Sequence, residues 1–87
     1  MEAALRSVVQ PDRLLEERWK TKCGEIESLI NVAARDGLLS EPLRDAAHLV
    51  RQAGNDAVHG KDISMEGSWK IIQFTRRIVE QVYERAA

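Results

Sequence analysis

The chain has 87 residues, of which 44% are hydrophobic and 31% charged, and its formal net charge is −1. This length suits a single domain, and the near-neutral balance excludes a nucleic-acid binder that relies on bulk positive charge. The one cysteine, Cys23, excludes an internal disulfide and a zinc site built from several cysteines. Any contact with phosphate must therefore come from a local group of side chains.

The first half of the chain predicts two helices. The first covers residues 2–9 and ends before Pro11, which disfavours helix at the preceding residue. It has no capping residue before it, so we expect a short or truncated helix in a fragment of a longer protein. The second covers residues 13–36 and ends at Gly37, with Trp19 and Cys23 on its apolar stripe. The thiol should therefore be buried, although Gly24 leaves open a break between Trp19 and Gly24.

The second half predicts two further helices and no strand. Ser40 is the expected N-cap of a helix over residues 41–59, and Ser64 caps a last helix that runs to the C-terminus. The apolar residues of the last helix cover a wider arc than one core face needs, which indicates a second partner. We therefore expect one all-α domain over residues 1–87, a small antiparallel four-helix bundle.

The third predicted helix has a face of small and apolar residues. They fall within an arc of roughly 100° when each residue is placed about 100° from the last. These residues are Leu43, Ala46, Val50, Ala53, Gly54 and Ala57. Small side chains let a neighbouring helix come close, so we expect Gly54→Leu to disrupt packing.

A polar ladder lies nearly opposite, within an arc of roughly 80°. Its members are Arg44, His48, Arg51, Asn55 and His59. Arginine can bind a phosphate through paired donors, and histidine can transfer protons near neutral pH. Arg51, Asn55 and His59 are therefore candidate catalytic residues for cutting a phosphodiester without a metal or cofactor. A structural alternative stays open, in which His59 serves the helix end and Asn55 bonds to the loop at residues 61–64.

The pattern Arg51-x-x-Gly54-Asn55-x-x-x-His59-Gly60 resembles a prokaryotic domain-of-unknown-function family that belongs to the HEPN-like superfamily. The resemblance extends over most of the chain. It implies a four-helix domain that pairs as a homodimer. It also implies that catalytic members are metal-independent ribonucleases with a shared cleft, and that relatives are attached to restriction or other defence modules. On this resemblance His59 would be the general acid–base residue, Asn55 the polar motif residue and Arg51 the phosphate-binding cation.

The sequence departs from the catalytic pattern in its spacing. Seven residues separate Arg51 from His59, more than in the catalytic members, and the Cα levels differ by roughly 12 Å along a helix. We therefore expect a non-catalytic or weakly active dimerisation or docking domain of a defence or restriction-type system. Its partner would be a second copy or another module of the parent protein. The alternative is a metal-independent endoribonuclease that acts on RNA as a homodimer.

The sequence has no apolar run long enough to cross a bilayer and no secretory signal. We therefore expect a cytoplasmic location and no membrane partner.

Overall fold

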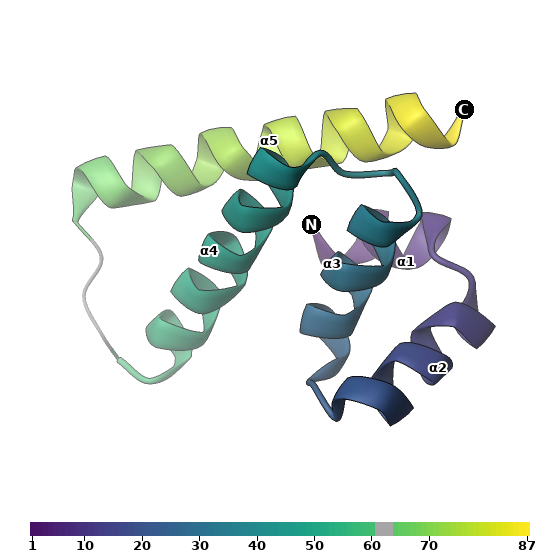
Figure 1. The fold of residues 1–87 in the computed structure, drawn as a ribbon. Helices are drawn as coiled ribbons and strands as arrows, with labels where there is room; N and C mark the ends of the chain where they lie inside the picture. The colour runs from purple at the N-terminus through teal and green to yellow at the C-terminus, as the bar shows by residue number, and fades with distance from the viewer. Residues whose placement is uncertain (61–63) are drawn as a thin grey trace.

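The computed structural model describes residues 1–60 and 64–87, and this part of the chain is helical without strands (Figure 1). Its helices are α1 (Glu2–Val8), α2 (Pro11–Thr21), α3 (Glu25–Arg35), α4 (Glu41–Val58) and α5 (Met65–Ala86). The all-α prediction is confirmed for these residues. The prediction of four helices is wrong, because residues 13–36 contain a break and supply most of α2 and all of α3.

The break between α2 and α3 lies between Trp19 and Gly24, where the sequence left a break open. Lys22 ends α2 in the left-handed conformation, with φ 55°, and Gly24 is the extended N-cap of α3. Cys23 thus lies in the connection, half-buried, and the prediction of a buried thiol on a helical stripe is wrong. Trp19 is 79% exposed because α2 turns Leu14, and not Trp19, toward the core.

Glycine ends α3 as the sequence predicts. Gly37 follows the C-cap Asp36 with φ +82°, a left-handed conformation that glycine adopts without strain. The Leu38 amide donates to the Ala33 carbonyl at 2.8 Å, and the Gly37 amide donates to the Ala34 carbonyl at 3.2 Å. This pair of bonds is a Schellman motif, which satisfies carbonyls that the helix end would leave unpaired.

The predicted starts of the last two helices are also confirmed. Ser40 precedes α4, with Pro42 in its first turn, where a missing amide hydrogen costs nothing. Ser64 is the N-cap of α5, and its Oγ accepts a hydrogen bond from the Gly67 amide at 3.0 Å.

The core lies where α1, α3, α4 and α5 meet. Its largest fully buried apolar side chains are Leu5, Leu29, Ile30, Val32, Ile78 and Val82. Burying one such side chain stabilises the fold by about 1.5–3 kcal/mol relative to leaving it exposed. Helix α4 packs between α3 and α5, while α1 also contacts α3 and α5. In Figure 1, α5 runs across the top of the molecule above both α4 and α1.

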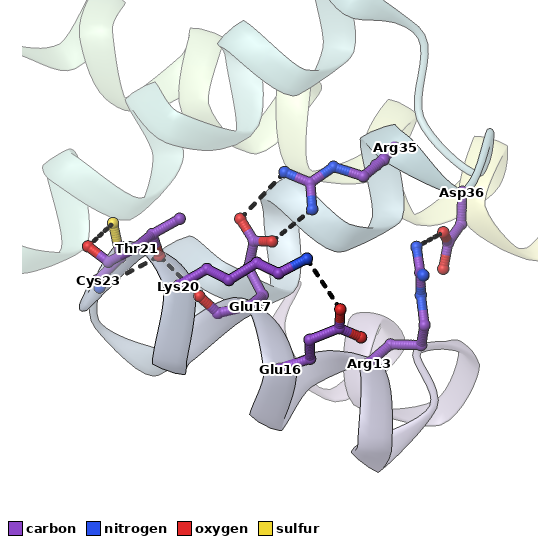
Figure 2. A network of polar contacts seen from close by, with 8 residues as sticks. All are labelled: Arg13, Glu16, Glu17, Lys20, Thr21, Cys23, Arg35 and Asp36. Carbon is purple, nitrogen blue, oxygen red and sulfur yellow. Dashed lines mark hydrogen bonds and ion pairs between the residues drawn. The ribbon is translucent and has the colours of Figure 1, made fainter.

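Helix α2 packs on α3 with a network of polar contacts (Figure 2). Glu17 of α2 is buried, and Arg35 of α3 reaches both of its carboxylate oxygens, at 2.5 and 3.2 Å. Arg13 pairs with Asp36 beyond the end of α3. Because a buried carboxylate needs a partner, the Glu17–Arg35 contact fixes how α2 lies against α3.

Candidate functional site

Arg51 and Asn55 line one groove. Helix α4 continues without a break through Gly54, so these two side chains project from the same side, one turn apart. The groove lies between the second half of α4 and the start of α3 and has a volume of about 590 Å³. Its lining comprises Glu2, Gly24, Glu25, Ile26, Glu27, Arg51, Gly54, Asn55 and Val58. The structure thus brings two of the three predicted site residues together.

His59 lies at the end of the helix and outside the groove lining. It is the exposed C-cap of α4, and its backbone amide donates to the Asn55 carbonyl at 3.2 Å. Gly60 follows with φ +74°. The structure therefore places His59 at the helix terminus, where the structural alternative also puts it, and separates its side chain from the groove that Arg51 lines.

The charge of the groove is mostly negative. Three carboxylates, those of Glu2, Glu25 and Glu27, line it together with one cation, Arg51. Arg6 pairs with Glu25 at 2.9 Å and offsets one of these charges. A phosphate backbone needs a net positive surface, so the lining of this groove disfavours RNA.

Arg51 itself has unused hydrogen-bonding capacity. It is half-buried, and its Nε atom is covered yet has no hydrogen-bond partner among the described residues. A covered donor without a partner costs free energy that a ligand acceptor could recover. This is the one feature of the groove that favours binding of an anionic or carbonyl oxygen.

The first half of the ladder packs on α3 instead of facing solvent. His48 Nε2 lies 3.2 Å from Asn31 Oδ1, so the ring donates from Nε2 to the amide oxygen. Partial burial lowers the pKa of His48, and the positive charge of Arg51 lowers this pKa further. His48 is therefore a neutral, structurally engaged imidazole at neutral pH. The first half of the polar ladder therefore borders the contact between α3 and α4, and the five residues do not form one solvent-facing reactive surface.

The predicted small-residue face of α4 is packed only in its first half. Ala46 is buried and Val50 packs against the core, but Ala57 is exposed. A Cβ placed on Gly54 would meet nothing within 4 Å in the described parts of the neighbouring elements. The expected close approach at Gly54 is therefore wrong, and the disruption expected from Gly54→Leu loses its packing argument. Gly54 instead lines the groove between α4 and the start of α3, so it faces open space among the described residues and not a packed helix.

Helix α5 has a second apolar side, as its wide arc predicted. Phe74, Ile78 and Val82 face the core, whereas Met65, Trp69 and Ile72 are 90%, 61% and 60% exposed. We call the side away from the core the outer stripe. Its members are Met65, Trp69, Ile72, Arg76, Val79 and Tyr83.

The two halves of the outer stripe differ in exposure. Val79 is half-buried, and the Tyr83 hydroxyl accepts a hydrogen bond of 3.4 Å from Ser7 of α1. Helix α1 thus covers part of the C-terminal half. The N-terminal half, from Met65 to Arg76, stays open to solvent.

A family model described as "Domain of unknown function (DUF4145)" matches residues 3–87. The chain belongs to the DUF4145 family. The match covers nearly the whole chain and agrees with the domain-of-unknown-function part of the predicted resemblance. No curated protein and no solved structure matches this DUF4145 chain.

Sequence reasoning missed the carboxylates of the DUF4145 groove. Glu25 and Glu27 lie in the first turn of α3, and Glu2 lies in α1. Acidic residues in a first turn are a helix-start signal, and this signal after Gly24 would have located the start of α3. Only tertiary packing, of α3 on α4 and of α1 on α3, brings these carboxylates to the groove that Arg51 lines.

Three further expectations concern metals, membranes and the last loop. Across the described parts of this DUF4145 chain, no three His, Cys, Asp or Glu side chains gather as a ligand set. None of its described helices is long and apolar enough to cross a bilayer. The predicted bond from Asn55 to the loop falls on residues 61–63, which lie outside the described part of the chain.

Proposed function

We propose that this DUF4145 chain is a HEPN-like dimerisation or docking domain that does not cut RNA by itself. The outer stripe of α5 carries the proposal. Large apolar side chains on the surface of a small monomer mark interaction sites when they form a continuous patch. Met65, Trp69 and Ile72 follow one another on one side of α5, and at least 60% of each is exposed.

The α3–α4 groove supports the non-catalytic part of the proposal. Cleavage of a phosphodiester by general acid–base catalysis needs a proton-transferring group near a bound phosphate. Here Arg51 shares its groove with three carboxylates, and His59 lies outside the groove lining. The arrangement is thus poorly suited to hold phosphate and to transfer a proton at the same point.

The second candidate is a metal-independent endoribonuclease that acts as a homodimer. One observation favours it: the Nε of Arg51, which has no hydrogen-bond partner among the described residues, lies in a half-buried side chain beside Asn55 in the groove lining. In this alternative the arginine binds the phosphate, Asn55 orients it and His59 moves the proton. A second copy would have to contribute to the cleft, since Arg51 lines the groove and His59 lies outside its lining.

The biological setting follows only from the resemblance. HEPN-like domains of this kind are attached to restriction or other defence modules. We propose the same role here, with the helical domain joining copies or modules of such a system. The docking surface would then determine assembly, while another module performs the chemistry.

The experiment incubates the chain with single-stranded and structured RNA in EDTA, beside Arg51→Ala and Ile72→Asn. A docking domain predicts intact RNA in every sample. Where the docking partner is a second copy, self-association also appears at high concentration, and Ile72→Asn weakens it while Arg51→Ala does not. RNA cleavage that disappears in Arg51→Ala would overturn the docking proposal in favour of the nuclease. Circular dichroism of each variant verifies that the helices are retained.

A further inference from the structure

We propose that the open half of the outer stripe pairs with the same segment of a second copy, in antiparallel orientation. The two-fold axis would pass between Trp69 and Ile72. This inference rests on the docking function proposed above and deepens it by naming the partner and the arrangement.

The spacing of the outer stripe is that of a two-helix seam. Its six members follow one another at intervals of four, three, four, three and four residues along α5. This alternation averages 3.5 residues, the repeat that keeps one side of a helix against a partner helix. The core-facing residues Phe74, Ile78 and Val82 fall outside this series, so α5 can pack on α4 and on a second helix at once.

The open half is long enough for a weak contact only. From Met65 to Arg76 the stripe extends over roughly 18 Å of helix axis. Two such segments bury less than the roughly 800 Å² per partner of a standard stable interface. We therefore expect association in the micromolar range or weaker, and a monomer in dilute solution.

The order of charges favours an antiparallel pair of identical segments. Glu66 lies beside the start of the open half, and Arg76 lies at its end. With the axis between Trp69 and Ile72, Arg76 of one copy comes opposite Met65 of the other, next to its Glu66. A parallel pair would instead place each Arg76 beside its own counterpart, which is repulsive.

These charges already have partners in the monomer, but the partners are exchangeable. Glu66 pairs with Lys70 at 3.6 Å, and Arg76 pairs with Glu80 at 3.0 Å, one turn away on the same helix. All four side chains are at least 60% exposed, so these pairs contribute little to stability. A net charge of only −1 per chain also leaves little long-range repulsion between two copies.

The proposed pairing has a consequence for the groove. Helix α4 contacts α3 on one side, where Arg51 and Asn55 line the groove, and contacts α5 on another side, where Leu49 and Ala53 lie. The outer stripe of α5 faces away from α4. Two copies joined through this stripe therefore keep their grooves apart and form no shared cleft around Arg51.

The test is a pair of charge reversals, read by sedimentation velocity at low ionic strength over a range of protein concentrations. Glu66→Arg alone and Arg76→Glu alone should each raise the dissociation constant about tenfold, because attraction becomes repulsion at two symmetric sites. The double variant should return it to within about threefold of the unmodified chain. Thermal unfolding of each variant separates weakened pairing from lost folding.

The outcomes separate this inference from the proposed function. A chain that stays monomeric at every concentration overturns the self-pairing. Association that is indifferent to both single reversals overturns the antiparallel arrangement, while its loss in Ile72→Asn would still support docking through α5. RNA cleavage that depends on Arg51 overturns the proposed function itself, whatever the reversals do.

Discussion

Arg35 of α3 reaches both carboxylate oxygens of Glu17 on α2, and the two partners differ sharply in exposure. The Glu17 side chain is 2% exposed, whereas that of Arg35 is 55% exposed. Removing the arginine leaves a buried carboxylate without its counterion, whereas removing the carboxylate leaves an arginine that water can solvate. Removing Arg35 should therefore lower the free energy of unfolding more than removing the carboxylate of Glu17.

We predict that Arg35→Ala lowers the free energy of unfolding by about 3 kcal/mol, the cost of an uncompensated buried charge. Glu17→Gln keeps an acceptor for Arg35 and should cost about 1 kcal/mol. Urea unfolding at neutral pH measures both values. Equal costs for the two variants would contradict the burial of Glu17.

The histidine that packs on α3 predicts a pH dependence of stability. The pKa of His48 is lowered in the folded chain, so the unfolded chain binds more protons as the pH falls below the ordinary histidine value of about 6.5. The free energy of unfolding should therefore decrease between pH 7 and pH 5. In His48→Gln, which can still donate to Asn31, this decrease should become smaller. Thermal unfolding between pH 7 and pH 5 measures this decrease. If stability depended on pH with the same slope in both proteins, the burial of this imidazole would be contradicted.

Gly54 should tolerate a larger residue. It lies inside α4, where a Cβ meets nothing within 4 Å in the described neighbouring elements, and alanine favours helix over glycine by about 1 kcal/mol. We predict that Gly54→Ala stabilises the chain by about 0.5–1 kcal/mol. Gly37→Ala is the matched control and should destabilise by about 1 kcal/mol, because its φ of +82° strains any side chain. Chemical denaturation should show a higher free energy of unfolding for Gly54→Ala and a lower one for Gly37→Ala.

The local signals of the sequence predicted most helix ends. Gly37 and Ser64 act through bonds within a few residues of themselves, so their roles are visible without the tertiary structure. The orientation of α2 was not predictable in this way. The short connection at Lys22 redirects the chain, and Trp19, which shares a helical period with the buried residues of α3, points to solvent.

In the candidate site too, the sequence predicted what depends on local helical geometry and not what depends on tertiary packing. Helical periodicity placed Arg51 and Asn55 on one side of α4, and both line the groove. It could not place His59, because α4 ends at Val58 and the imidazole leaves the helical series there. It also could not supply the carboxylate of Glu27, which reaches Arg51's groove only through packing of α3 on α4.

The most direct test of the account compares the two exposed tryptophans. Trp69 on the outer stripe of α5 and Trp19 on α2 are 61% and 79% exposed, so replacing either with serine removes a similar apolar surface. We measure the molar mass in solution by light scattering at high protein concentration. The account predicts that Trp69→Ser shifts the chain to monomer and that Trp19→Ser leaves its association unchanged. Association that survives Trp69→Ser would contradict it, and so would association that is lost in Trp19→Ser.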